Sequence, residues 1–65
     1  MFLQKVLELV EKEEMQLSIE FKPDHHADEC WQVKIYPKNA DGYFFGYYDT
    51  LERACKKILK EMDLL

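Results

Sequence analysis

The apolar residues of this chain follow two different periods, and the change of period separates helices from strands. Over residues 2–14, apolar side chains recur three and four positions apart with charged residues between them, which predicts an amphipathic helix. From Met15 to Lys22, apolar and polar residues alternate, which predicts a strand with one buried face. Pro23 ends this strand because proline has no backbone N–H to donate to a sheet, and a loop over 23–29 follows.

The second half of the chain predicts two more strands and a second helix. Alternation over residues 31–36 predicts the second strand, and an aromatic-rich third strand covers residues 43–48. The Asp-Gly pair at 41–42 between them is typical of a hairpin turn, because glycine tolerates a positive φ. We expect the last helix to begin with a capping box, in which Asp49 accepts from first-turn amides and Glu52 reaches back.

Apolar and basic residues occupy opposite faces of this last helix. The apolar stripe consists of Leu51, Ala54, Cys55, Ile58 and Met62. The basic face consists of Arg53, Lys56, Lys57 and Lys60. The order of elements is therefore αβββα, and the fold class is α+β, with two helices covering one face of a three-stranded antiparallel sheet. The other face stays open, and residues 1–65 form a single domain.

Length and charge narrow the choice of partner. A chain of 65 residues buries only a small core, so burial of further surface by self-association would help to stabilise the fold. The net charge is −4, and the acidic excess lies in residues 1–30, so the chain favours basic protein partners over nucleic acid phosphates. The sequence has no apolar run of membrane-spanning length and no signal-peptide pattern. We therefore expect a cytoplasmic protein with two reduced cysteines and no membrane partner.

The first candidate site is the open face of the sheet. Its outward residues on the first two strands are Gln16, Ser18, Glu20, Lys22, Gln32, Lys34 and Tyr36. The third strand adds either Phe44 and Tyr48, or Tyr43, Phe45 and Tyr47, because aromatic residues fill both parities. Exposed rings in this number are typical of an interface, unless the sheet curls and covers them. The residues predicted to bind a partner are Tyr36, Tyr43, Phe45 and Tyr47, with Glu11, Glu13 and Glu14 as an acidic flank.

The basic face of the last helix is the second candidate site. Its four cations could meet phosphate groups or an acidic protein. The alternative interpretation is a solvated helix face, partly neutralised by Glu52 and Glu61, and the acidity of the whole chain favours it.

Metal and catalytic sites are not predicted. Residues 24–30 include His25, His26 and Cys30, which zinc would accept, but adjacent histidine side chains diverge and no second ligand cluster follows. Cys55 lies on the apolar stripe, where a thiol behaves as a small buried hydrophobe and not as a nucleophile. The chain has no glycine-rich phosphate loop and no serine elbow. We therefore expect a protein without enzymatic activity, cofactor or metal.

The element order resembles that of the double-stranded RNA-binding domain, although an acidic segment stands where that family carries lysines at the start of its second helix. Residues 45–54, Phe-Gly-Tyr-Tyr-Asp-Thr-Leu-Glu-Arg-Ala, are similar to the strand–helix junction of ethylene-response-type DNA-binding domains and of HicB-type antitoxins. This second resemblance implies the geometry of the junction and carries over no functional residue. The chain also resembles short, acidic, aromatic-rich proteins of αβββα type encoded by bacteriophages, among them anti-CRISPR inhibitors of host defence.

Together these features predict a small protein-binding module, of the phage accessory or inhibitor type, that docks on a host protein in the host cytoplasm. If the target is a protein that handles nucleic acid, the clustered carboxylates could occupy its phosphate-binding groove. Two alternatives stay open. One is a nucleic-acid-binding domain that uses the basic face and the rings of the third strand. The other is a structural homodimer whose open faces pack together.

Overall fold

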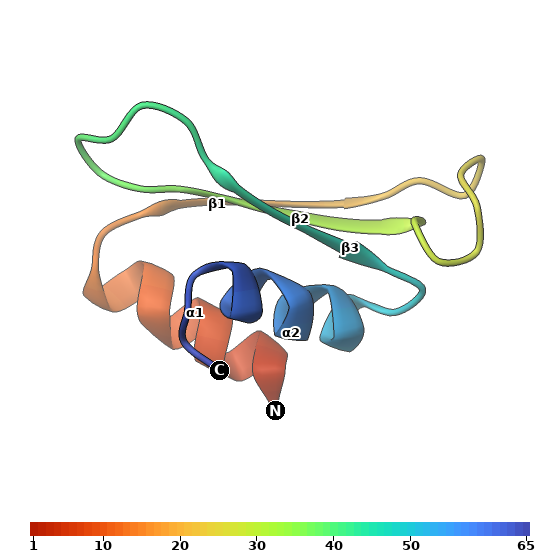
Figure 1. Ribbon diagram of the computed structural model, residues 1–65, viewed down its shortest axis with the longest axis horizontal. Coiled ribbons are helices and arrows are strands. Elements are labelled where there is room, and N and C mark those ends of the chain that lie inside the picture. Colours follow the sequence, from red (N-terminus) through yellow and green to blue (C-terminus); the bar gives the residue numbers. More distant parts are fainter.

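The computed structural model describes residues 1–65 and confirms the expected order of elements and the α+β class (Figure 1). The elements are α1 (Phe2–Lys12), β1 (Gln16–Phe21), β2 (Trp31–Tyr36), β3 (Phe44–Tyr48) and α2 (Leu51–Glu61). The strands form one antiparallel sheet in the order β1-β2-β3, and both helices lie on the same side of it. The first helix and the first strand are each slightly shorter than the sequence pattern predicted. Neither helix has the length and apolar character needed to cross a membrane.

The strand register decides which side chains share a face of the sheet, because directly opposed residues point the same way. Val33 is fully buried toward the helices and stands opposite Ile19 and Gly46. The odd-numbered residues of β1 and β2 and the even-numbered residues of β3 therefore face the helix layer. Of the two predicted alternatives for the third strand, the structure selects the one in which Phe45 and Tyr47 lie on the open face.

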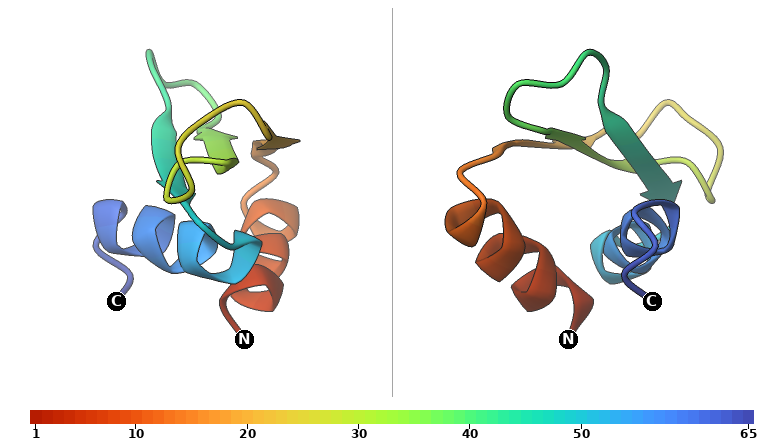
Figure 2. Two further views of the ribbon diagram at one scale, coloured as in Figure 1. Left: turned by 90° about the vertical axis from the view of Figure 1, so that its right-hand side faces the viewer. Right: turned by 60° about the vertical axis from the view of Figure 1, so that its left-hand side comes forward.

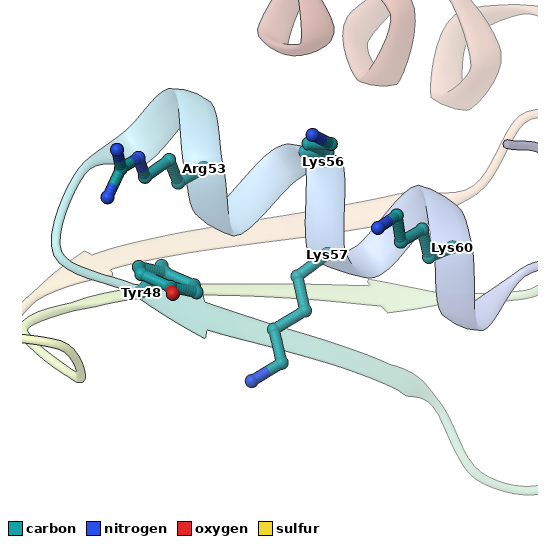
Figure 3. A pocket seen from close by; sticks show the side chains of 5 residues that line it. All are labelled: Tyr48, Arg53, Lys56, Lys57 and Lys60. Carbon is teal, nitrogen blue, oxygen red and sulfur yellow. The ribbon is translucent and has the colours of Figure 1, made fainter.

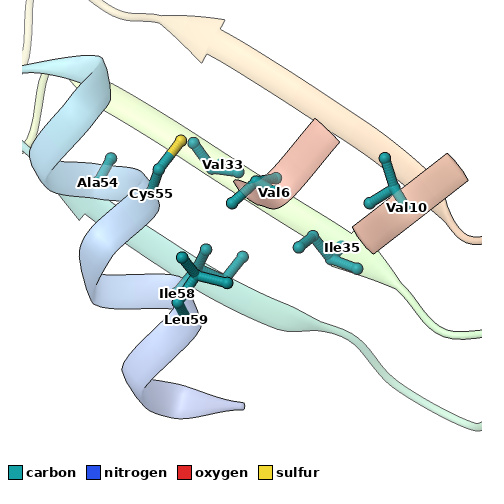
Figure 4. Packing of buried hydrophobic residues seen from close by; sticks show 8 residues of the cluster. All are labelled: Val6, Val10, Val33, Ile35, Ala54, Cys55, Ile58 and Leu59. Atoms are coloured by element: carbon teal, nitrogen blue, oxygen red, sulfur yellow. The ribbon is translucent and has the colours of Figure 1, made fainter. Parts of the chain in front are cut away.

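The hydrophobic core lies between β2, the two helices and the middle of β3 (Figure 4). It consists of Val6, Val10, Val33, Ile35, Ala54, Cys55, Ile58 and Leu59. The apolar stripe of α2 is confirmed at its centre, while Leu51 and Met62 at its two ends are only partly buried. Leu59, which the sequence analysis left outside the stripe, belongs to the core as well. Burial of this cluster is the main favourable contribution to folding.

Helix α2 lies directly on Gly46 in β3. A Cβ atom at this position would stand 2.6 Å from the carbonyl oxygen of Ala54 and 2.8 Å from the backbone nitrogen of Ile58. Both distances are below van der Waals contact, and neither backbone atom moves without the helix. The absence of a side chain at Gly46 therefore sets how closely the helix approaches the sheet.

The capping box predicted at the start of α2 is wrong. The N-cap is Thr50, whose Oγ1 accepts a hydrogen bond from the backbone N–H of Arg53 at 3.1 Å. Asp49 lies one residue too early to cap, and its carboxylate pairs with the Arg53 guanidinium at 3.3 Å. Threonine, like aspartate, favours the N-cap, and the path of the chain leaving β3 places Thr50 there in place of Asp49.

Glu52, the expected partner in that box, caps the other helix. Its carboxylate accepts hydrogen bonds from the backbone N–H groups of Phe2 and Leu3 in the first turn of α1. Met1 occupies the N-cap position of α1 and offers no side-chain acceptor of its own. Free amides and the positive end of the helix dipole attract a carboxylate, so Glu52 supplies the hydrogen-bond acceptor that the N-cap residue of α1 lacks.

Strand β1 departs from the predicted half-buried pattern. Ile19 and Phe21 face the helix layer, as the alternation predicted, yet they are 38% and 54% exposed. The reason is that α1 packs chiefly against α2, whereas α2 covers β3 and β2. Figure 2 shows β1 at the rim of the sheet on the α1 side, with β3 at the opposite rim above α2.

Candidate binding surfaces

The aromatic face consists of Tyr36, Tyr43, Phe45 and Tyr47, on the side of the sheet that no helix covers. The ring centroids of Tyr36 and Tyr43 are 5.2 Å apart, and those of Phe45 and Tyr47 are 5.3 Å apart. Tyr43 is 53% exposed and Phe45 is 36% exposed. All four residues of the predicted aromatic site are therefore brought together on one surface.

Lys34 of β2 lies between the two ring pairs. Its ammonium nitrogen is 5.6 Å from the ring centroid of Tyr43 and 5.7 Å from that of Phe45. A cation at this distance is attracted by the electron-rich ring faces, and the aliphatic part of the side chain covers apolar surface. The centre of the aromatic face thus carries one positive charge held between exposed rings.

The loop between β1 and β2 closes one end of the aromatic face. A hollow of about 300 Å³ there is lined by His25, Glu29, Gln32, Phe45 and Tyr47. Gln32 was predicted to be exposed, but it is only 8% exposed because this loop folds over it. Its side-chain amide donates to the carbonyl oxygen of Glu29 at 3.4 Å and lies 3.4 Å from Nδ1 of His25. Sequence alternation places a residue on a face and carries no information about a loop that covers it.

The acidic flank lies at the end of α1. Glu11, Glu13 and Glu14 are exposed on the helix layer, whereas the aromatic face is on the other side of the sheet. The Glu14 carboxylate pairs with the ammonium of Lys38 at 3.1 Å, and Lys38 belongs to the loop that follows Tyr36. The acidic flank therefore meets the aromatic face only at the rim formed by the β2–β3 loop.

The basic face of α2 shares a hollow with the ring of Tyr48. A shallow hollow of about 480 Å³ is lined by Tyr48, Arg53, Lys56, Lys57 and Lys60 (Figure 3). Arg53 is paired with Asp49, but the three lysines form no salt bridge. The ammonium of Lys57 lies 4.1 Å from the ring centroid of Tyr47 and 5.6 Å from that of Tyr48, so it connects the basic face with the edge of the aromatic face. The helical spacing of the four cations did not indicate that Tyr48 contributes to this surface.

The two cysteines have separate environments. Cys55 is fully buried in the core, and burial, together with the negative charge of Glu52, raises the pKa of its thiol to about 11. At neutral pH this thiol is protonated and is a poor nucleophile. Cys30 is partly exposed, and its thiol donates to the carbonyl oxygen of Ala27 at 3.4 Å.

No three histidine, cysteine, aspartate or glutamate side chains gather closely enough to hold a metal ion. His25 turns toward Gln32 on the aromatic side of the sheet, and Cys30 turns to backbone carbonyls of Ala27 and Asp49. The side chains of His25 and Cys30 therefore turn to different partners.

A scan against protein-family models, a search of curated proteins and a search of solved structures each found no match to this chain.

Proposed function

We propose that this chain is a non-enzymatic protein-binding domain that docks on its partner through the aromatic face. The observation that supports this most strongly is the placement of four rings, in two tilted contact pairs, on a sheet surface without a helix above it. Rings bury a large area while few rotatable bonds become ordered, and they are enriched at the energetic centres of interfaces. The free chain leaves Tyr43 more than half exposed, so the contact area is accessible.

The charges around the rings define the chemistry of the partner. Because Lys34 places a positive charge at the centre of the aromatic face, a complementary partner has a carboxylate within an otherwise apolar recess. The acidic flank at the rim favours basic groups beside that recess. The resemblance to short phage-encoded inhibitors extends the proposal to a host protein, including one that handles nucleic acid and offers a basic groove. In that case Glu11, Glu13 and Glu14 would face the groove.

Affinity capture with point variants tests this proposal. Immobilised wild-type chain, Tyr43→Ser, Phe45→Ser and the control Leu64→Ser are exposed to the same host lysate. Leu64 is 52% exposed and lies beyond the end of α2, so the control removes a comparable apolar side chain elsewhere. We expect one protein to be retained by the wild type and the control and to be lost with both ring variants. Titration of that protein should show a loss of more than about 1 kcal/mol per ring, which is more than about fivefold in affinity.

Retention of the same proteins by all four forms would contradict the proposal, provided that circular dichroism shows the variants to be folded. Because Tyr43 precedes β3 and is more exposed than Phe45, Tyr43→Ser is the variant least able to disturb the core.

A second candidate function is binding of single-stranded nucleic acid along the basic face. It is supported by three lysines that lack carboxylate partners and line one hollow together with Tyr48, because cations beside aromatic rings are typical of single-strand binding grooves. A gel-shift titration at low salt decides between the two candidates. Binding weaker than about 10⁻⁴ M would fall below ordinary non-specific affinity and would end the nucleic acid proposal.

A further inference from the structure

Strand β1 has an outer edge that nothing in the chain blocks. It forms one rim of the sheet, and α1 packs chiefly against α2 (Figure 2). Natural edge strands are commonly protected by proline, a bulge or an inward-pointing charge, because an open row of N–H and C=O groups can pair with another strand. Residues Gln16–Phe21 contain none of these devices, and their register with β2 is unbroken.

Apolar side chains gather along the same rim. Ile19 and Phe21 of β1 are 38% and 54% exposed on the side of the helix layer, and Leu7 of α1 is 41% exposed. Leu9 lies beside Leu59 on the flank of α1 that faces α2. Leu7 is about 160° around the helix from Leu9, on the flank turned away from α2. The rim of β1 therefore combines an open backbone edge with an exposed apolar strip.

The hydrogen-bond phase of β1 shows which backbone groups are open. The N–H of Lys22 donates to the carbonyl oxygen of Cys30 at 2.7 Å. Hydrogen-bonded positions alternate along an antiparallel ladder, so the even-numbered residues of β1 direct their N–H and C=O groups toward β2. Leu17, Ile19 and Phe21 direct theirs to the outer edge.

We propose that two copies of this chain pair through their β1 edges, antiparallel about a two-fold axis at Ile19, to form one six-stranded sheet. In this register Ile19 stands opposite Ile19 of the second copy, and Leu17 stands opposite Phe21. All three open pairs of N–H and C=O groups are then satisfied. On the other side of the sheet Ser18 stands opposite Glu20, so no like charges meet.

Two neighbouring registers that keep apolar residues on one side are less suitable. With the axis at Ser18, Phe21 would stand opposite Met15, whose N–H already donates to the carbonyl oxygen of Val10 at 2.9 Å. With the axis at Glu20, two carboxylates would face each other directly, which is destabilising. The strand is thus self-complementary in one register, which is the property that a two-fold interface requires.

This arrangement leaves the aromatic face free. A two-fold axis between antiparallel edge strands is perpendicular to the sheet, so both helix layers lie on one side and both aromatic faces on the other. The pairing is therefore independent of the proposed function. It also differs from a homodimer in which the aromatic faces pack together, because that dimer would bury Tyr36 and Tyr43.

Sedimentation velocity from micromolar to millimolar concentration tests the pairing. We expect the wild type to dimerise and both Ile19→Lys and Phe21→Lys to raise the dissociation constant at least about tenfold. Leu64→Lys, at an apolar residue 52% exposed away from the rim, should leave the constant unchanged. Tyr36→Glu should leave it unchanged too. A dimer lost only with Tyr36→Glu would overturn the proposal, and so would a wild type that is monomeric at every concentration. The β1 edge would then be open to pairing with an extended segment of another protein.

Amide hydrogen exchange gives a readout that does not depend on variants. In the dimer the amides of Leu17, Ile19 and Phe21 should exchange slowly, and dilution should remove their protection. The amides of Ser18 and Glu20, which donate to β2, should stay protected at both concentrations. Fast exchange of the first three amides at high concentration would contradict pairing through β1.

Discussion

At the scale of single residues, Gly46 has the largest structural effect for its size. It is the one glycine within a strand, and α2 lies against it with backbone atoms of Ala54 and Ile58. This contact also settles the faces of β3, because a residue pressed against the helix places its neighbours Phe45 and Tyr47 on the open side. The sequence held this signal, since a glycine inside a strand pattern often marks a close backbone approach.

Replacing Gly46 by alanine should destabilise the fold by about 1–3 kcal/mol, because the added methyl group overlaps backbone atoms that move only with the whole helix. Urea denaturation measures the change. Gly42→Ala is the control, since nothing lies within 4 Å of a Cβ atom there and only its φ of +98° opposes the substitution. Equal stability of the Gly46 variant and the wild type would show that α2 does not press on the strand.

The two thiols should react at different rates. Cys55 is buried and its thiol pKa is raised to about 11, whereas Cys30 is partly exposed. At neutral pH a thiol reagent should label Cys30 in the native protein and label Cys55 only through unfolding. Measuring Cys55 alone in Cys30→Ser checks this, and rapid labelling of that variant without denaturant would contradict the observed packing.

At the scale of elements, the two helices depend on each other through Glu52. The residue belongs to the first turn of α2, but its carboxylate accepts the first amides of α1. These hydrogen bonds lower the pKa of Glu52 below its usual value of 4.5. The contact joins residues 50 positions apart in the chain, so local helix-capping rules assigned Glu52 to the wrong helix.

Glu52→Gln should make stability less sensitive to acid. A carboxyl group with a lowered folded-state pKa contributes stability above its unfolded-state pKa, and this contribution is lost as the pH falls below about 4.5. Between about pH 6 and pH 3, the melting temperature of the wild type should therefore fall further than that of the variant. Glu61→Gln, at an exposed carboxylate without a salt bridge, is the control and should behave like the wild type. Parallel curves for all three would show that Glu52 does not cap α1.

At the scale of the whole molecule, opposite charges collect at different places. The acidic flank lies at the end of α1, while the basic face of α2 is held beside Tyr48 on the other edge of the sheet. The net charge of −4 is a sum over the chain and does not describe this separation of acidic and basic surfaces. A partner that approaches the aromatic face meets negative charge at the β2–β3 rim and positive charge near Lys57, which favours one orientation of docking.

Replacing Glu11, Glu13 and Glu14 by glutamine should lower the association rate with the captured partner and flatten its dependence on salt. Steering by exposed charges acts on the encounter, so the dissociation rate should change little. The matched control, Asp28→Asn with Glu61→Gln and Asp63→Asn, removes three charges elsewhere and should keep the steep salt dependence. Stopped-flow kinetics at several ionic strengths checks this, and equal rates for both triple variants would mean that the acidic flank plays no part in steering.

The aromatic face could be predicted in outline but not in detail. Tyr36 followed from alternation, whereas Tyr43, Phe45 and Tyr47 were one of two sets left open for the third strand, and only the register decided between these sets. The hollow with His25 and Glu29 could not be predicted, because alternation does not describe the path of a loop. The role of Tyr48 beside the basic face was missed for a related reason: its ring faces the helix side yet lies at an uncovered margin.

The sequence by itself determined the number, type and order of the elements and the apolar stripe of α2, because periods of two and 3.6 residues, prolines and turn pairs are local properties of the chain. Tertiary structure alone decided that Thr50 caps α2, that Glu52 caps α1 and that Ile19 and Phe21 stay exposed. The cap of α2 depends on the path of the chain leaving β3. The other two depend on how α1 packs against α2, which is decided by contacts between residues far apart in the sequence.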